Sequence, residues 1–272
     1  MNPFGPRLRA ALLAGRREGR RGVGAVALRR SDGYEFSELR EYVEGDDPRR
    51  IDWAATARAG NLQTRVILED HALLLGVALD ASPSMHVGRG RSNYDLACDA
   101  AALWYGVAID DDRCARFGAV PLVLRDMRGR AGALACAARR EPPGTALDGA
   151  LRLALAILAR GARLLVVSDF YELDALAPLL RACAARFDLT VLFARDPWHA
   201  GLPLDGFVRL RDAETGIVAR LHIGRHARTR FASAVAARER DVFEALQRTG
   251  ARVGTLDEAT GPQQALARTF AL

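Results

Sequence analysis

Short apolar runs alternate with longer amphipathic segments over most of the chain. The run 72–79 is continuously apolar, which is typical of a strand buried on both faces. Leu164–Ser168 and Leu189–Ala194 have the same character. Between the runs, apolar residues recur three and four positions apart, which predicts helices over Asn93–Ile109, Thr145–Ala159, Leu176–Arg186 and Ala227–Arg248. This alternation predicts an α/β fold with a mostly parallel central sheet and helices on both faces.

Further elements complete this pattern. Cys114–Val120 and Leu122–Leu124 read as a strand pair, followed by a short Ala-rich helix. Phe207–Leu210 and Ile217–Ile223 predict a hairpin, because a turn sequence containing Gly216 joins them. A strand over Arg252–Leu256 and a final helix close the chain. Three parts are therefore expected: a basic, Gly-rich arm over 1–30, an extension with little regular periodicity over 31–70, and the α/β domain over 71–272.

Composition removes several classes of enzyme. The chain has 272 residues and a net charge of +6, from 39 basic and 33 acidic residues, and all of its basic residues apart from histidine are arginine. Without lysine there is no Walker A phosphate lysine and no Schiff base, which excludes P-loop ATPases and pyridoxal-phosphate enzymes. The high Arg and Ala content is better explained by a GC-rich genome than by a basic binding function.

Cysteine spacing and hydropathy bear on location. Four cysteines lie far apart without a C-x-x-C pair, as expected of reduced thiols in a cytoplasmic protein. The apolar patch Ala10–Ala14 is too short for the core of a signal peptide. The longest uncharged apolar stretch, Ala100–Ile109, is about half of a membrane span. The sequence therefore predicts a cytoplasmic protein without a membrane-spanning segment.

Oxygen-bearing side chains follow two of the predicted buried strands. Asp80, Ser82 and Ser84 follow the first strand, whereas Asp169 follows the second directly after Ser168. In open α/β sheets, ligands bind beyond the carboxyl ends of the strands. Thr145 stands at the start of a helix between them. Such hard donors suit Mg²⁺ or Mn²⁺ and disfavour zinc or copper, although each residue alone also fits a role as a helix or turn cap.

The order Asp-x-Ser-x-Ser, then Thr, then Asp resembles the metal-ion-dependent adhesion site of von Willebrand factor A domains. That resemblance implies a Rossmann-like von Willebrand factor A fold. It also implies that Ser82, Ser84 and Thr145 coordinate a Mg²⁺ or Mn²⁺ ion, with Asp80 and Asp169 acting largely through water. In that family an acidic group of a partner protein typically fills the remaining coordination position.

A second signature lies upstream, in the segment from Arg40 to Arg58. Its run of acidic, basic and aromatic residues resembles the "domain of unknown function 58" family of bacterial proteins, and the resemblance covers the chain from about residue 31 onward. Many relatives carry membrane helices before this segment, where this chain has its basic stretch. The matching residues that we expect to form either a partner-binding surface or an ion-paired scaffold with a packed Trp are Arg40, Tyr42, Asp46, Asp47, Arg49, Asp52, Trp53 and Arg58.

The two resemblances together imply a non-catalytic protein-interaction module. Genes of the family commonly lie beside those of MoxR-type AAA+ ATPases, which implies an adaptor or co-chaperone role. One alternative is a Mg²⁺-dependent phosphohydrolase, but that chemistry needs a second Asp where Ser82 stands, and a lysine. Another alternative is nucleic-acid binding through arginines such as Arg225–Arg230, which no aromatic residues interleave. No nucleic acid is therefore expected as a partner.

Overall fold

The computed structural model describes residues 4–15, 35–42, 48, 51–68, 72–118, 127–144, 147–199 and 201–272. The chain divides into two compact units, one made of residues 1–25 and 73–272 and the other of residues 26–72. None of the described helices is both long and apolar enough to cross a bilayer.

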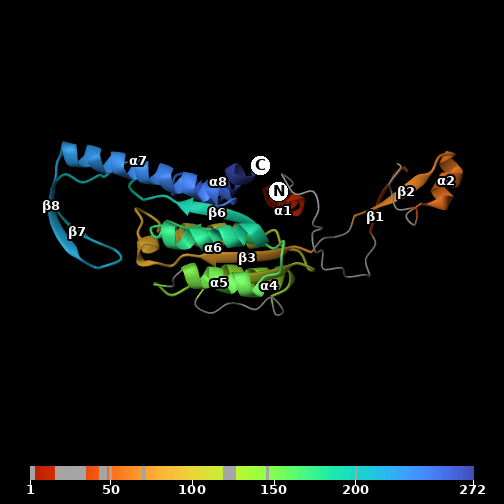
Figure 1. The fold of residues 1–272 in the computed structure, drawn as a ribbon, viewed down its shortest axis with the longest axis horizontal. Helices are drawn as coiled ribbons and strands as arrows, with labels where there is room; N and C mark the ends of the chain where they lie inside the picture. The colour runs from red at the N-terminus through yellow and green to blue at the C-terminus, as the bar shows by residue number, and fades with distance from the viewer. Residues whose placement is uncertain are drawn as a thin grey trace. The chain divides into compact units, whose positions relative to one another are not determined.

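A five-stranded parallel sheet forms the centre of the larger unit (Figure 1). Its order β4-β3-β5-β6-β9 becomes 2-1-3-4-5 when the strands are counted along the chain, which is the order of a doubly wound sheet. The α/β fold class with a mostly parallel sheet is therefore confirmed. The strands are β3 (Leu74–Leu79), β4 (Arg113–Phe117), β5 (Arg163–Ser168), β6 (Asp188–Ala194) and β9 (Arg252–Leu256).

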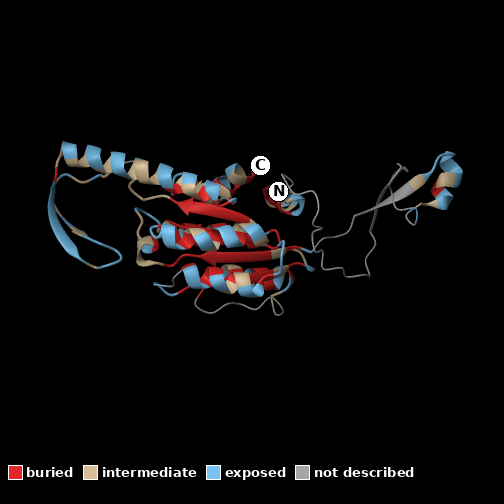
Figure 2. Ribbon diagram, in the orientation of Figure 1, coloured by how far each residue is buried: buried red, intermediate tan, exposed pale blue. Residues whose placement is uncertain are grey.

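Helices cover both faces of this sheet. On one face Leu75, Val77 and Leu79 of β3 pack with the first group of helices, and on the other Ala78 packs with the second group. Figure 2 shows the strands buried between helices whose outer sides are exposed. Each fully buried aliphatic side chain contributes roughly 1.5–3 kcal/mol. The first group is α1 (Phe4–Ala14), α3 (Asn93–Tyr105), α4 (Gly129–Ala138) and α8 (Gly261–Phe270), and the second is α5 (Leu147–Ile157), α6 (Leu173–Arg186) and α7 (Arg225–Arg248).

The start of the chain corrects the expectation of a basic arm over 1–30. Phe4, Leu8 and Leu12 recur every four residues along α1 and are buried in the first face of the core. Arg9 of the same helix pairs with Asp112. An arm was predicted because glycine and arginine dominate the region. The apolar stripe of α1 is short and stands among arginines, so it was not recognised in the sequence. Residues 16–34 lie outside the described part of the chain.

Asp112 is the buried charge that holds this end of the sheet together. Its carboxylate is fully buried, accepts hydrogen bonds from the backbone N–H of Leu73 (2.6 Å) and of Ile109 (2.8 Å), and meets Arg9. One side chain therefore ties α1 to the start of β3 and to the turn before β4. Removing it would leave these donors buried without their acceptor.

The smaller unit corrects a second expectation, that of an extension with little regular structure. Strands β1 (Glu35–Glu41) and β2 (Gln63–Leu68) pair antiparallel, with helix α2 (Trp53–Ala59) between them in the chain. Asp52 caps α2 by accepting a hydrogen bond from Ala55 N–H at 2.9 Å. Gly60 ends it in the left-handed conformation at φ 76°. Charged residues occupy so much of this region that its sequence shows neither the two-residue alternation of a strand nor the 3.6-residue repeat of a helix.

A hairpin extends from the sheet domain between β6 and α7 and confirms the pair of strands expected there. Strands β7 (Gly206–Arg211) and β8 (Val218–Ile223) pair antiparallel, with Gly206 opposite Ile223. Helix α7 follows directly and is about 36 Å long, yet its buried residues are Val242 and Leu246, near its C-terminal end. The first half of α7 and the hairpin thus lie largely outside the core (Figures 1 and 2).

Replacing Asp112 by Ala is expected to destabilise the fold by about 2–4 kcal/mol, because it strands two buried N–H donors and the Arg9 guanidinium. Urea unfolding followed by circular dichroism measures this loss. Asp111→Ala is the matched control, because Asp111 is adjacent in the chain and its carboxylate is exposed. Equal stability of the two variants would contradict the role assigned to Asp112.

Candidate functional site

The candidate site lies at the point where the sheet changes its winding direction. β3 and β5 are adjacent and parallel, with Leu79 opposite Val167. The chain leaves β3 toward α3 on one face and leaves β5 toward α6 on the other. Such a point opens a crevice beyond the strand ends, where α/β proteins bind their ligands. Asp80 and Ser168 stand on its two sides.

The Asp80 carboxylate joins the two loops at this crevice. Its Oδ1 accepts a hydrogen bond from Ser82 N–H at 2.8 Å, and its Oδ2 accepts one from the Ser168 hydroxyl at 2.6 Å. The Ser168 hydroxyl in turn accepts from Phe170 N–H at 2.9 Å. Asp80 is only 7% exposed. Buried and doubly hydrogen-bonded, it fixes the position of the serines that follow it.

The two serines lie at a short 3₁₀ turn, η2 (Pro83–His86): Ser82 is its N-cap residue and Ser84 lies within it. Their hydroxyl oxygens are 3.1 Å apart, and the fully buried Met85 anchors the turn in the core. Gly144 N–H donates to the carbonyl of Ala81 at 2.6 Å, which brings the segment before α5 to the same edge. Thr145, the remaining hydroxyl expected at the site, lies outside the described residues.

Asp169 is the second carboxylate of the group and is only 5% exposed. Burial raises its pKa to about 6; the hydrogen bond with Ser84 opposes this effect, and the nearby charge of Asp80 adds to it. These influences place Asp169 beside both Asp80 and Ser84. Four of the five predicted site residues are therefore together: Asp80, Ser82, Ser84 and Asp169.

The loop that carries Asp169 is held in an uncommon conformation. Phe170 has φ 52°, a left-handed value that is rare for a residue with a side chain. Its buried ring packs near Phe193, and Arg238 of α7 donates a hydrogen bond to the Asp169 carbonyl at 2.9 Å. The guanidinium of Arg238 also lies 4.0 Å from the centre of the Tyr171 ring. Packing and this clamp keep the strained loop in place.

The donor set fits a hard divalent cation. Two carboxylates and two hydroxyls approach one another, and burial together with the charge of Asp80 raises the pKa of Asp169. Oxygen donors of this kind suit Mg²⁺ and Mn²⁺. Among the described residues, no cluster of three or more His, Cys, Asp or Glu side chains could hold a metal. A metal here would thus depend on the serine hydroxyls as well as on the carboxylates.

One residue at this edge was not expected from the sequence. The Glu214 carboxylate accepts a hydrogen bond from Ser84 N–H at 2.8 Å, across 130 residues of chain. Glu214 lies in the turn of the β7–β8 hairpin. The hairpin itself was predicted, but no sequence signal indicates where its tip lies, because that depends on the direction in which the chain leaves β6.

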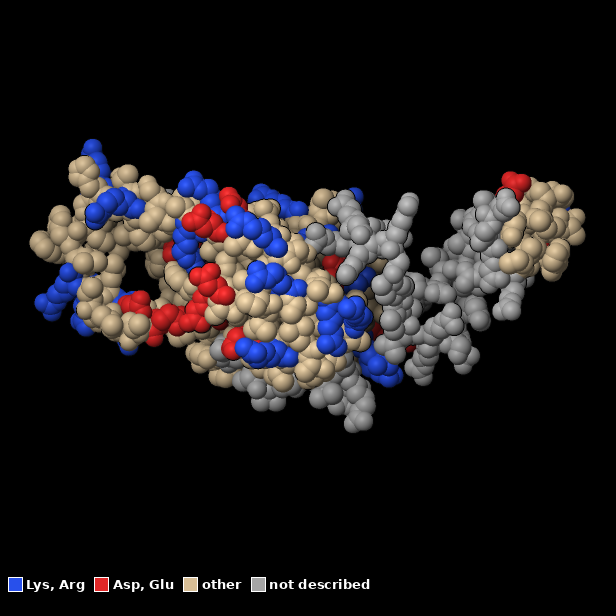
Figure 3. Space-filling model, viewed as in Figure 1, with Lys and Arg blue, Asp and Glu red and all other residues tan. Residues whose placement is uncertain are grey.

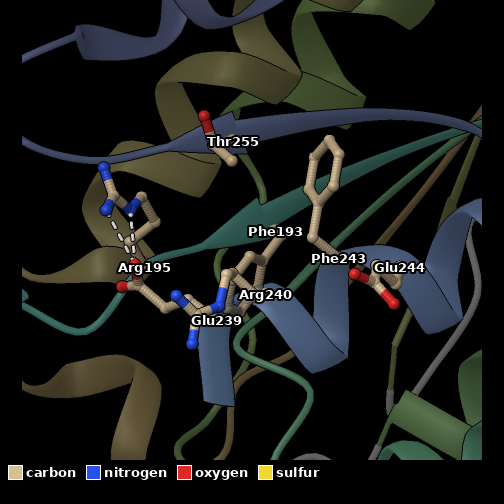
Figure 4. A pocket seen from close by; sticks show the side chains of 7 residues that line it. All are labelled: Phe193, Arg195, Glu239, Arg240, Phe243, Glu244 and Thr255. Atoms are coloured by element: carbon tan, nitrogen blue, oxygen red, sulfur yellow. Dashed lines mark hydrogen bonds and ion pairs between the residues drawn. The ribbon is translucent and has the colours of Figure 1, made fainter. Parts of the chain in front are cut away.

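A separate hollow of 360 Å³ lies between α7, β6 and β9 (Figure 4). Its main cation, Arg195, is already paired with Glu239 at 2.7 Å and lies 3.6 Å from Asp257. None of its lining residues belongs to the oxygen cluster, so we treat it as distinct from the candidate site. The lining residues are Phe193, Arg195, Glu239, Arg240, Phe243, Glu244 and Thr255.

The upstream signature falls in the smaller unit. Arg40 pairs with Thr64 in the β1–β2 ladder, and Tyr42 N–H donates to the Leu62 carbonyl at 2.8 Å. The Arg58 Nε donates to the carbonyl of Ala54. Asp52, as the cap of α2, has a structural role. The expected residues that lie outside the described part of the chain are Asp46, Asp47 and Arg49.

Trp53 lies in the smaller unit, and its exposure is known within that unit. It is the first residue of α2 and its exposed fraction is 68%. The two roles expected for Trp53, a contact in a partner-binding surface and a packed anchor of the scaffold, both stay predictions.

Comparisons with known proteins assign a family. Residues 38–241 match the family described as "Protein of unknown function DUF58". The chain is 32% identical over 232 residues to the uncharacterized protein Rv1480 of Mycobacterium tuberculosis, covering 80% of this chain and 73% of that protein. An uncharacterized protein of Mycobacterium avium, MAV169, is 35% identical over 126 residues, which cover 43% of this chain and 70% of that protein.

Two solved structures are also similar. The conserved hypothetical protein BatB from Bacteroides thetaiotaomicron aligns with a TM-score of 0.46 at 17% identity, covering 74% of this chain and 98% of that one. A von Willebrand factor type A structure from Catenulispora acidiphila aligns with a TM-score of 0.41 at 16% identity, covering 76% of this chain and 43% of that one. The order and parallel direction of the five strands define the α/β fold of this chain.

Replacing Asp169 by Asn is expected to stabilise the metal-free protein by roughly 2–3 kcal/mol at pH 8, because the raised pKa of Asp169 means that its ionised form is disfavoured in the fold. The gain should shrink as the pH falls from above 6 toward 4, where the wild-type carboxyl is protonated. Melting temperatures at pH 5 and pH 8 with a chelator present measure it. The control is Asp174→Asn, an exposed position on α6. A gain that does not change with pH would contradict the assignment.

Proposed function

This chain belongs to the DUF58 family of proteins of unknown function, and from that premise we propose that it is a non-catalytic protein-interaction module. In this proposal the edge of the sheet at Asp80 holds a divalent cation and recognises an acidic group on a partner protein. The observation that carries the proposal is the convergence of Asp80, Ser82, Ser84 and Asp169 at the winding switch of the sheet.

Mg²⁺ or Mn²⁺ is the proposed ion. Ser82, Ser84 and Thr145 would coordinate it, while Asp80 and Asp169 would act largely through bound water. In this proposal the direct ligands are uncharged hydroxyls and the two carboxylates act through water, so that the open coordination position of the dication would attract an anionic group. An acidic partner group would bind at that position.

The same geometry supports a binding role in preference to catalysis. Both Asp80 oxygens already accept hydrogen bonds, from Ser82 N–H and the Ser168 hydroxyl, which makes Asp80 a positioning group and a poor nucleophile. The phosphohydrolase alternative would also need a lysine, which this chain lacks. We therefore propose no reaction for the site.

The proposed partner and location follow from the family and from the cysteines. A MoxR-type AAA+ ATPase is the partner class that the family resemblance implies, and the module would serve it as an adaptor or co-chaperone. All four cysteines are free and buried, and burial raises the pKa of Cys114 and of Cys183 to about 12. Inert thiols of this kind are compatible with the cytoplasmic location that we propose.

Calorimetric titration with Mg²⁺ and Mn²⁺ tests the metal site. Asp80→Asn is expected to weaken binding by about 10–100-fold, as is typical when a group that orients metal ligands is lost. Ser84→Ala should weaken it at least as much, because it removes a proposed ligand. Asp174→Asn is the control for a lost surface charge. Unchanged binding in both site variants, or no binding to the wild type, would refute the metal site.

The partner is tested by capture on immobilised wild type and Asp80→Asn protein, using the MoxR-type ATPase of the same genome. Binding to the wild type should require Mg²⁺ and disappear with EDTA, because the cation would supply the contact to the acidic group. The Asp80→Asn protein should retain little of the ATPase. Capture that persists equally in EDTA would show that recognition does not involve the metal.

A further inference from the structure

The tip of the β7–β8 hairpin places a carboxylate of this chain at the candidate site. Glu214 Oε1 lies 2.8 Å from the backbone nitrogen of Ser84, the residue whose hydroxyl and amide both face this edge. We infer that Glu214 is an internal competitor for the acidic partner group, so that the hairpin tip must be displaced before a partner can bind. This inference rests on the proposed function, because it assigns the regulation of the same site.

The turn is built to hold Glu214 at its tip. The Asp212 carboxylate accepts hydrogen bonds from the backbone N–H of Thr215 at 2.6 Å and from its hydroxyl at 2.7 Å. Gly216 N–H donates to the Asp212 carbonyl at 3.0 Å, with Gly216 in the left-handed region at φ 69°. These bonds leave the Glu214 side chain free to point away from the turn. The turn therefore presents this carboxylate in a fixed position.

The body of the hairpin is weakly held by comparison. Five of the six β8 residues are exposed, and Phe207 of β7 is 91% exposed. Asp205 and Arg228 form an exposed ion pair of 4.0 Å, a kind that contributes little. Figure 2 shows the hairpin mostly exposed, with intermediate residues alternating along β7. Among the described contacts, the bond between Glu214 and Ser84 is the one that ties the tip to the sheet domain.

Chemistry explains why the two carboxylates would exclude each other. A carboxylate has two oxygens, and a partner group that approaches a cation beside the Ser84 hydroxyl with one oxygen would use a neighbouring N–H for the other. Ser84 N–H is that neighbour, and Glu214 already occupies it. On the face drawn in Figure 3, acidic and basic side chains are interspersed over the larger unit. A second carboxylate would meet the repulsion of the Glu214 carboxylate as long as Glu214 remains at Ser84.

The contact between Glu214 and Ser84 would lower the apparent affinity for a partner carboxylate without altering the cation site itself. Only the fraction of molecules with the tip displaced can accept a partner carboxylate, and the apparent dissociation constant rises in proportion. Conversely, a partner that also contacts the exposed hairpin would open the site as it binds. A partner that binds the hairpin as well as the cation would therefore gain access to the cation, whereas a small carboxylate alone would not displace the tip as easily.

The first test uses amide hydrogen exchange at Ser84 in the metal-free protein. Glu214→Ala should speed exchange of this amide roughly tenfold, because it removes a charged acceptor. Glu214→Gln, which keeps an acceptor oxygen but loses the charge, should give an intermediate rate. Glu172→Gln removes an exposed carboxylate that follows β5 and should leave the rate unchanged. Equal rates in wild type and Glu214→Ala would overturn the inference.

The second test uses glutarate as the carboxylate probe and measures how Mn²⁺ bound to the protein broadens its proton resonances. Glu214→Ala should bind glutarate several-fold more tightly than the wild type, and Asp80→Asn should abolish the broadening. Faster Ser84 exchange without tighter glutarate binding would overturn the competition. If Mn²⁺ binds neither wild type nor Glu214→Ala, the proposed function fails, while the exchange rates still decide whether Glu214 holds the tip at Ser84.

Discussion

The Asp80 carboxylate is the interaction on which the rest of the candidate site depends. It is buried at the end of β3 and accepts one hydrogen bond from its own loop, through Ser82, and another from the loop after β5, through Ser168. A buried carboxylate is costly unless its oxygens are satisfied. The two loops satisfy it only in the arrangement that also brings Ser84 and Asp169 together. One charge therefore sets the geometry of four side chains.

The same arrangement holds a second carboxylate, that of Asp169, buried at this edge. Asp169 lies beside Asp80 and its pKa is raised to about 6, mainly by burial. The positive φ of Phe170 and the clamp from Arg238 hold it there nonetheless. Conformational strain and a carboxyl with a raised pKa at one place are typical of a site kept for binding. Arg238 lies on α7, and α7 directly follows the hairpin that carries Glu214. The residue that holds the Asp169 loop and the residue that bonds to Ser84 therefore belong to consecutive elements of the chain.

The sequence was most informative where burial is complete. The apolar run 72–79 identified β3, and Leu164–Ser168 matches β5 to within one residue, because strands covered on both faces must be apolar throughout. The polar residues after these strands then indicated the candidate site. Helix α1 was missed because its stripe of Phe4, Leu8 and Leu12 is short and set among arginines. Glu214 could not be predicted, since its position depends on tertiary packing across 130 residues.

The central claim is that the oxygen cluster binds a divalent cation, and a crystal structure of the Mn²⁺-soaked protein tests it most directly. The anomalous signal of manganese locates the ion without reference to any assumption about its ligands. The account predicts a single strong peak bounded by Asp80, Ser82, Ser84 and Asp169. A map with no peak there, or with manganese bound only elsewhere, would contradict it.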